Sequence, residues 1–316
     1  MDDDTARRLA GPLEGTPVTV GAVTLDVHIA GPADGEVVLL VAGLGMPRIS
    51  WPPELIAQLH EAGYRTVTAD NRDTGRSTVL PGGLAGLERT PEGTPAAVYS
   101  LTDLAGDLVG LLDHLEVTRA HVLGVSMGGM IAQRIAIDWP DRVATLHLVM
   151  TTTGDWSVGL PHEGVSWVLT TPAPDGLDGL LAHQLAAAEA TGSPGLVDPT
   201  RVQAMVRAEY ARGVHPAGTA RQLAAILADP DRTPDLRELA VPTVVVHGAV
   251  DPLIDVSGGR AVAAAIRDSR YVEVPGMGHD LPPELLGTFL PTILEVMAAA
   301  TAGGAPWPRR PTSRRW

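Results

Sequence analysis

The chain has no cysteine and no lysine among its 316 residues, and aromatic residues make up only 3% of it, with a single phenylalanine. The absence of cysteine excludes disulfides, thiol catalysis and cysteine-ligated metal sites. Because aromatic side chains are scarce, a hydrophobic core has to be built mainly from valine, leucine, isoleucine and alanine. Apolar residues account for 45% of the chain, which is enough for the interior of a globular protein.

Positive charge is scarce as well, since the formal net charge is −14 and arginine is the only basic residue besides histidine. Nucleic acids and anionic membranes are bound by clustered positive charge, so the composition argues against both kinds of partner. The exception is the C-terminal end, where arginines lie among proline, threonine and serine. We expect residues 301–316 to be a disordered tail, with docking to an anionic partner as the alternative.

The N-terminal residues carry no targeting signal that we recognise. Residues 1–10 include three consecutive aspartates and lack the cationic start and apolar run of a secretion signal. We also expect no membrane-spanning segment, which would need about 20 apolar residues. These features predict a cytoplasmic protein and leave open whether it is a monomer or a homodimer.

Predicted strands and helices alternate through residues 1–150, and the alternation resumes over 241–300. Continuous apolar runs such as 37–41 are typical of strands that are buried on both faces of a parallel sheet. Leucines at helical spacing predict a helix over 101–115, with Thr102 as its N-cap. The pattern indicates an α/β fold with a mostly parallel central sheet and helices on both faces.

Residues 151–240 interrupt this alternation. The segment has helical character and no convincing strand, and it is too long to be a simple loop. We expect a helical cap over the edge of the sheet at which the parallel strands end. The predicted organisation is a discontinuous core (1–150 and 241–300), the cap (151–240) and the tail (301–316).

The segment that carries most chemical information surrounds Ser126, in a Gly-x-Ser-x-Gly pattern over 124–128. This pattern alone is weak in a glycine-rich chain, where it can be an ordinary strand–helix connection. Its context strengthens it, because a short buried strand leads into the serine and a helix follows. That arrangement holds a nucleophile on a sharp turn above the sheet, with small residues at Gly124 and Gly128 allowing close packing. Ser126 is therefore the predicted nucleophile.

A serine hydroxyl needs a neighbouring base to act as a nucleophile. His279 follows the last predicted strand and should meet Ser126, because the carboxyl ends of parallel strands share one edge of the sheet. Asp251 follows the preceding strand and is the expected acid that orients the histidine. Asp155, after the strand that ends at Val149, is the competing candidate. The order Ser, Asp, His matches this arrangement on an α/β fold.

Backbone N–H groups of Met127 and Leu44 are the expected donors of an oxyanion hole. Trp156 and Trp167 of the cap are candidates for lining an apolar substrate pocket, with simple packing as the alternative. His247 is expected only to pack locally. Carboxylates and histidines do not cluster at ligand spacing, and the glycine-rich segments do not resemble a phosphate cradle, so we expect no metal and no organic cofactor.

Together these motifs resemble the α/β-hydrolase superfamily over about residues 18–298. Residues 70–77 (DNRDTGRS), 247–252 (HGAVDP) and 275–279 (PGMGH) are similar to esterases of the aclacinomycin methylesterase type, which tailor polyketides. The resemblance implies the same fold and the same serine chemistry. One departure concerns the oxyanion loop, where many relatives carry His-Gly and this chain has Ala-Gly at 42–43.

The predicted function is hydrolysis of a carboxylic ester through an acyl-enzyme. The substrate would be a small molecule, such as a methyl ester or another ester of an apolar or polyketide-like compound. Carbon–carbon bond hydrolysis and cofactor-free perhydrolysis use the same triad, and the sequence does not separate them. Epoxide hydrolysis and dehalogenation are disfavoured because those relatives place aspartate where Ser126 stands. A protein of this fold that only binds a ligand is the alternative from another class.

Overall fold

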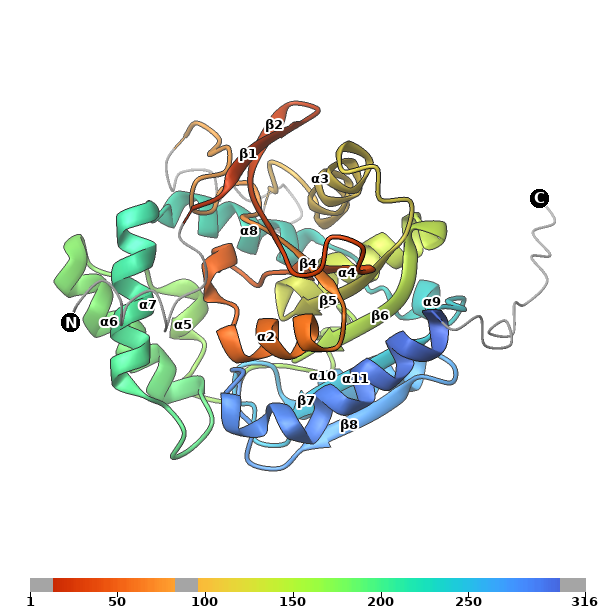
Figure 1. Ribbon diagram of the computed structural model, residues 1–316. Helices are drawn as coiled ribbons and strands as arrows, with labels where there is room; N and C mark the ends of the chain where they lie inside the picture. Colours follow the sequence, from red (N-terminus) through yellow and green to blue (C-terminus); the bar gives the residue numbers. More distant parts are fainter. Residues whose placement is uncertain (1–13, 83–95, 302–316) are drawn as a thin grey trace.

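The computed structural model describes residues 14–82 and 96–301. The predicted arginine-rich tail lies outside the described residues, apart from Thr301. The centre of the molecule is an eight-stranded sheet with the order β1-β2-β4-β3-β5-β6-β7-β8 (Figure 1). Its strands are β1 (Thr16–Val20), β2 (Val23–Ala30), β3 (Val37–Val41), β4 (Arg65–Ala69), β5 (Ala120–Val125), β6 (Val143–Val149), β7 (Thr243–Gly248) and β8 (Arg270–Val274).

Strands β1 and β2 form an antiparallel hairpin, and β2 pairs antiparallel with β4, whereas every other neighbouring pair in the sheet is parallel. The mostly parallel sheet of the predicted α/β fold is thereby confirmed. Within the described residues, the helices outside the segment between β6 and β7 are α2 (Pro53–Glu61), α3 (Leu101–His114), α4 (Met127–Asp138), α10 (Val256–Ala265) and α11 (Leu286–Thr301), with short 3-10 turns η1 (Arg48–Ser50), η3 (Pro140–Arg142) and η4 (Pro283–Leu285).

The helices form a layer on each face of the sheet. Helices α3, α4 and α10 contribute to one hydrophobic cluster, and α2 and α11 contribute to a second one. Strand β3 faces both clusters, since Leu39 and Val41 belong to the first while Val38 and Leu40 belong to the second. This alternation explains the continuous apolar run of the strand. Each fully buried aliphatic side chain stabilises the fold by about 1.5–3 kcal/mol relative to an exposed one.

Helix α3 begins one residue after Ser100, so the prediction of Thr102 as its N-cap was wrong. Ser100 has extended backbone angles, and its hydroxyl accepts a hydrogen bond from the Asp103 N–H at 3.1 Å. The Asp103 carboxylate accepts in return from the Ser100 N–H at 2.7 Å, which completes a capping box. Thr102 lies inside the first turn, where its backbone is already helical.

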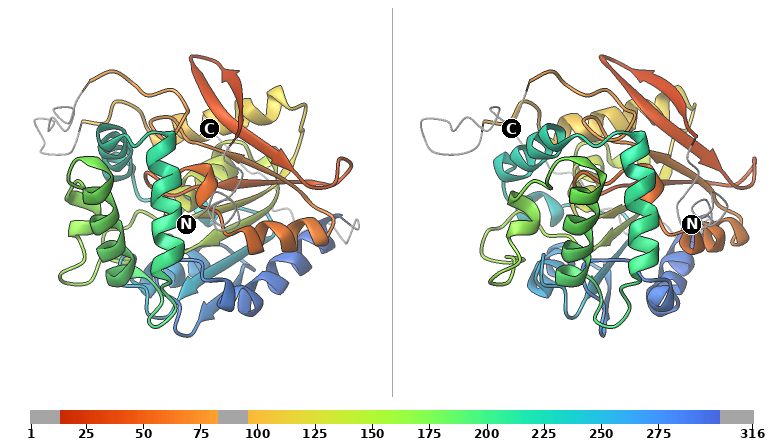
Figure 2. Two further views of the ribbon diagram at one scale, coloured as in Figure 1. Left: turned by 60° about the vertical axis from the view of Figure 1, so that its left-hand side comes forward. Right: turned by 90° about the vertical axis from the view of Figure 1, so that its left-hand side faces the viewer.

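Helices α5 (Trp167–Thr170), α6 (Gly176–Thr191), α7 (Pro199–Arg212), α8 (Pro216–Ala228) and α9 (Thr233–Leu236) lie between β6 and β7. We call residues 151–240 the insertion. Figure 2 shows α5 to α8 grouped together on one side of the molecule. The insertion leaves the sheet at the carboxyl end of β6, which places it next to the loops in which the predicted catalytic residues occur.

The stretch Pro283–Thr301, which contains α11, is long and apolar enough to cross a membrane by length and composition. No such stretch was expected from the sequence. In the fold, α11 packs against β6, β7 and β8, and its side chains Phe289, Leu290 and Ile293 are fully buried. Its hydropathy is therefore that of a helix that covers one face of the central sheet.

Candidate active site

Ser126 lies on a sharp turn between β5 and α4, as its motif predicted. Its backbone angles are φ 54° and ψ −123°, a conformation that is unusual for a residue with a side chain and that costs free energy. The turn is possible because its neighbours are small. A Cβ atom at Gly124 would lie 2.2 Å from the Gly128 carbonyl oxygen, and one at Gly128 would lie 2.0 Å from that of Val41. The tight packing fixes the serine at the carboxyl end of the sheet.

Ser126, His279 and Asp251 are joined by hydrogen bonds although they lie far apart in the sequence. The Ser126 Oγ lies 3.0 Å from Nε2 of His279, and Nδ1 of His279 lies 2.7 Å from Oδ2 of Asp251. Because a carboxylate only accepts, Nδ1 carries a proton and Nε2 is left to accept one from the serine. The three predicted side chains therefore meet in the geometry that base-assisted serine chemistry requires.

Asp251 is buried and held in one orientation by its own loop. Its Oδ1 accepts hydrogen bonds from the N–H groups of Leu253 at 2.9 Å and Ile254 at 3.0 Å, which leaves Oδ2 for His279. Burial by itself would raise the pKa of Asp251. The positive charge that His279 carries when it is protonated and the hydrogen bonds from His247 and His279 outweigh burial and hold the pKa of Asp251 below its usual range. Asp251 is thus ionised at neutral pH.

His247 is a second histidine beside Asp251. It is fully buried, its Nε2 lies 3.4 Å from Oδ2 of Asp251, and the same nitrogen donates to the Ile254 carbonyl at 2.8 Å. Only local packing was expected for this histidine from the sequence. In the sequence His247 is only a histidine at the end of a predicted strand, so no local pattern indicated this contact.

The loop that carries His279 is fastened to the end of α6. The His279 N–H donates to the Thr191 carbonyl at 2.7 Å, and the Gly278 N–H donates to the Ser193 hydroxyl at 2.9 Å. Ser193 in turn donates to Asp280 through its hydroxyl at 2.5 Å and its N–H at 3.0 Å. The insertion thereby helps to hold the histidine in place. In the sequence, the only indication that Asp280 helps to hold the loop is its position next to His279.

The predicted oxyanion donors lie close to the serine. Gly43 precedes Leu44, and a Cβ atom at Gly43 would be 3.4 Å from the Cβ of Ser126. Met127 is the first residue of α4, where a backbone N–H has no partner within the helix. In the part of the chain that the structure describes, neither the Leu44 N–H nor the Met127 N–H donates a hydrogen bond. Both groups are therefore available to an acceptor beside Ser126.

The remaining site predictions concern the insertion. Trp156 is 57% exposed, and the ring of Trp167 packs edge-on against His183 with the ring centres 5.3 Å apart. Asp155, the competing acid, accepts a hydrogen bond from the Ser157 N–H at 2.8 Å, while His279 is bonded to Asp251. Substrate contact by the two tryptophans stays a prediction.

The motif over 70–77 docks the insertion onto the core. Both side-chain oxygens of Asp73 accept from Arg221 of α8, at 2.6 and 2.8 Å, and Oδ2 of Asp70 accepts from Arg212 of α7 at 2.5 Å. These side chains are buried. In the sequence the motif indicated a family resemblance and not this docking role, because the arginines that pair with it lie more than a hundred residues away.

Replacing Arg221 with methionine is expected to lower the free energy of unfolding by about 3–5 kcal/mol at pH 7, because Asp73 would keep a buried, unpaired charge. Burial raises the pKa of Asp73, but Arg221, Tyr99 and the Leu80 N–H outweigh it, so the pKa is lowered. A carboxyl group whose pKa is lowered in the folded protein stabilises the fold at pH values above its ordinary pKa of about 3.9. This contribution is lost as the pH falls through the pKa that the group has in the folded protein. The difference between variant and wild type should therefore shrink in acid, as urea titrations at pH 7 and pH 3.5 would measure.

Arg260→Met is the matched control for this prediction. Arg260 makes the same two-pronged contact, with Glu273 at 2.8 and 2.9 Å, but its side chain is 57% exposed. Exposed pairs contribute little to stability. Equal losses from the two variants, or a loss from Arg221→Met that does not change with pH, would contradict a docking role for the buried pair.

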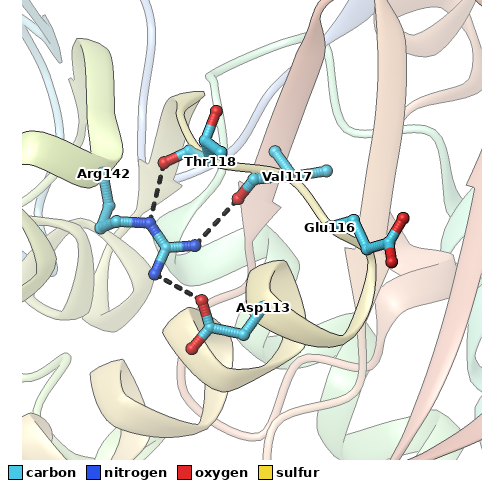
Figure 3. Close-up of a pocket in the computed structure, with 5 residues that line it drawn as sticks. All are labelled: Asp113, Glu116, Val117, Thr118 and Arg142. Carbon is cyan, nitrogen blue, oxygen red and sulfur yellow. Dashed lines mark hydrogen bonds and ion pairs between the residues drawn. The ribbon is translucent and has the colours of Figure 1, made fainter.

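A groove on the surface, shown in Figure 3, lies away from Ser126 and the residues bonded to it. Arg142 lines it and donates to the carbonyls of Thr118 and Val117, both at 2.8 Å, and to Asp113 at 2.7 Å. Thr118 precedes β5 and Ser126 follows it, so the groove and the serine lie at opposite edges of the sheet, about 20 Å apart. Through these contacts Arg142 links the chain segment that leads into β6 with the one that leads into β5.

Among residues 14–82 and 96–301, no three histidine, aspartate or glutamate side chains are grouped so that they could hold a metal ion. The histidines at the site are instead bonded to Ser126, Asp251 and a backbone carbonyl. The chemistry that this arrangement offers is that of a positioned base beside a hydroxyl.

The chain is similar in sequence to bacterial hydrolases along most of its length. A protein of Variovorax paradoxus described as the carbamate hydrolase RutD is 30% identical over 299 residues, which cover 89% of this chain and 99% of the relative. The rhodomycin D methylesterase DauP of a Streptomyces species is 29% identical over 289 residues, which cover 84% of this chain and 92% of the relative.

The structure is similar to that of an enol-lactonase from Burkholderia xenovorans, with a TM-score of 0.70 and 24% identity over 90% of this chain and all of that one. At this level of sequence identity, the similarity shows only that the two proteins share a fold. The family described as the alpha/beta hydrolase fold matches residues 36–284. Since this match spans most of the chain, the protein belongs to the α/β-hydrolase family.

Proposed function

We propose that the protein is a serine hydrolase that cleaves a carboxylic ester through an acyl-enzyme on Ser126. The observation that carries the proposal is the continuous series of hydrogen bonds from Asp251 through His279 to Ser126, with lengths of 2.7 and 3.0 Å. The two unengaged N–H groups beside the serine support it further. Family membership supports hydrolysis in general, and the geometry supports the serine mechanism.

In the first half of the reaction, Nε2 of His279 accepts the proton of the Ser126 hydroxyl while Oγ attacks the carbonyl carbon of the ester. The carbonyl oxygen becomes negatively charged, and the N–H groups of Leu44 and Met127 donate to it. The carbon–oxygen bond to the alcohol then breaks, and Nε2 gives its proton to the leaving oxygen. Asp251 stabilises the positive imidazolium that exists between these two proton transfers.

In the second half, water replaces the alcohol. Nε2 of His279 accepts a proton from the water while its oxygen attacks the acyl carbon, and the same two N–H groups stabilise the second tetrahedral intermediate. The bond to Oγ breaks and Ser126 recovers its proton from His279. The acid product leaves, and the side chains return to the starting arrangement.

The proposed substrates are methyl esters of apolar, polyketide-like small molecules. The similarity to DauP over 84% of the chain supports this class, as does the motif over 70–77. The similarity to RutD makes a carbamate the second substrate class to test. The two classes are distinguished by their products, since a methyl ester releases methanol and an unsubstituted carbamate releases ammonia.

The test of the proposal is to trap the acyl-enzyme. Purified protein is mixed with p-nitrophenyl butyrate, quenched in acid and measured by intact mass and peptide mapping. We expect a burst of about one p-nitrophenolate per chain and a butyryl group on the peptide that contains Ser126. A folded protein that shows neither burst nor turnover with p-nitrophenyl esters, methyl esters or carbamates would refute ester hydrolysis. Carbon–carbon hydrolysis, perhydrolysis or ligand binding would then take its place.

A further inference from the structure

Two side chains hold the loop 42–45 on either side of Leu44. Nδ2 of Asn71 donates to the Ala42 carbonyl at 3.2 Å, and Oε1 of Gln222 accepts from the Gly45 N–H at 2.8 Å. The loop is also closed on itself by a hydrogen bond of 3.2 Å from Met46 to Gly43. The direction of the Leu44 N–H is thereby set by its fastened neighbours.

Gln222 belongs to α8 of the insertion and is fully buried. Its Nε2 donates to the Arg72 carbonyl at 2.8 Å and to the Thr74 hydroxyl at 2.9 Å, so every polar atom of the amide has a partner. A backbone N–H at Oε1 and a backbone carbonyl at Nε2 permit only one orientation of the amide. Gln222 is therefore a rigid bridge between the insertion, the motif over 70–77 and the loop 42–45.

A second side chain of α8 supports the same contact. Gly45 has a φ of 64°, and a Cβ atom there would lie 2.9 Å from the Thr219 hydroxyl, so α8 packs directly on the backbone of the loop. Thr219 and Gln222 are three residues apart and lie on the same face of the helix. A movement of α8 would therefore move Gly45 with it.

We infer that Gln222 is a positioning residue through which the insertion keeps the oxyanion loop in its catalytic conformation. The inference rests on the proposed serine hydrolase function, because it concerns the N–H of Leu44 as a donor to the developing oxyanion. A donor stabilises a transition state only if its direction is set before the reaction, so a loosened loop slows the chemical step more than it weakens substrate binding.

Gln222→Met removes both hydrogen-bonding ends of the side chain and keeps its length. We expect kcat for p-nitrophenyl butyrate to fall by about 10- to 100-fold, less than for outright loss of an oxyanion donor, with KM changed by less than about threefold. The affinity for phenylboronic acid should fall by the same factor as kcat/KM, because the tetrahedral boronate on Ser126 needs the same N–H donors. The dependence of kcat on pH should not shift.

Thr74→Val is the matched control. It removes one hydrogen bond of the same amide on the docking side and leaves the Gly45 contact in place. We expect a lower melting temperature with kcat and boronate affinity within about twofold of wild type. If Gln222→Met does not fold, Gln222→Asn, which keeps the amide but shortens it, is measured in the same way and should show the same losses of kcat and boronate affinity.

The outcomes separate this inference from the function on which it rests. Wild type that neither turns over esters nor binds the boronate would overturn the proposed function and this inference together. Wild type that does both, with a folded Gln222 variant equal to it in kcat and boronate affinity, would overturn the inference alone. Equal losses of kcat in the Gln222 and Thr74 variants would assign the effect to docking of the insertion and would also overturn it.

Discussion

Ester hydrolysis by the Ser126→Ala variant is expected to be slower than by wild type by a factor of about 10⁴–10⁶ in kcat. The change removes the single oxygen that attacks the substrate. The geometry of the turn should survive, because Ser126 N–H still donates to the Val149 carbonyl and Thr151 still donates to the Ser126 carbonyl, both through backbone atoms of residue 126. The loss would therefore be chemical. Residual turnover would come from the oxyanion donors and from binding alone.

Ser269→Ala is a suitable control for this prediction. The Ser269 hydroxyl donates to the Ala263 carbonyl at 3.0 Å, just before β8 and at the edge of the sheet away from the triad. Its loss should leave kcat within about twofold of wild type, as expected for a change remote from the reacting atoms. Initial rates with p-nitrophenyl butyrate and circular dichroism spectra would be measured for all three proteins. If Ser126→Ala kept a tenth of the wild-type kcat, Ser126 would not be the nucleophile.

Much of the fold could be predicted because its signals are local. Apolar runs such as 37–41 mark strands that are buried on both faces, and the structure places them side by side in a mostly parallel sheet. Such a segment is apolar because it is buried, whichever strands and helices it packs against. The strand can therefore be recognised from its own sequence alone. The start of α3 was missed because Ser100 and Thr102 are both acceptable N-caps by type, and only the reciprocal bond with Asp103 separates them.

The three residues at the centre of the site were predictable for a different reason. Ser126, Asp251 and His279 each follow a parallel strand, and topology brings such positions to one edge without any further contact being known. The chemistry of the triad then selects among few candidates. Their hydrogen-bond partners were less accessible to prediction, since His247 could be recognised only as a histidine at the end of a strand.

The residues that connect the insertion with the core could not be predicted at all. Arg212, Arg221 and Gln222 lie on helices whose sequence shows only that they are amphipathic or exposed. Their partners include Asp26, Asp70, Asp73 and Gly45, which lie far from them in the sequence. A buried ion pair or amide bridge leaves no periodic pattern in the sequence, because its two partners lie far apart along the chain. No short segment contains both of them. The sequence therefore does not show how the insertion packs on the core.

Asp251→Asn is the second change for which we expect a very large effect, a loss of about 10³–10⁴ in kcat. The two carboxylate oxygens of Asp251 are not equivalent. Oδ1 accepts from the N–H groups of Leu253 and Ile254, so an asparagine should keep its carbonyl oxygen there and turn its amide nitrogen toward His279. That nitrogen is a donor, and the position facing it, Nδ1 of His279, would have to become an acceptor.

The consequence of this reversal is that Nε2 of His279 carries the proton and cannot accept one from the Ser126 hydroxyl, 3.0 Å away. The variant would also lack the negative charge that stabilises the imidazolium. Fold and substrate binding should change little, because asparagine has the same shape, so the loss should appear in kcat and not in KM. Nitrogen NMR of the His279 ring would show the altered tautomer directly.

Asp155→Asn tests the same chemistry at the other acid that the sequence offered. Asp155 accepts from the Ser157 N–H in a local turn, and asparagine can do the same, so kcat should stay within about twofold of wild type. The reverse result, a large loss with Asp155→Asn and a small one with Asp251→Asn, would mean that the acid comes from the strand after the nucleophile. Because the hydrogen bond of 2.7 Å joins His279 to Asp251, we expect the charge that matters for the base to lie there.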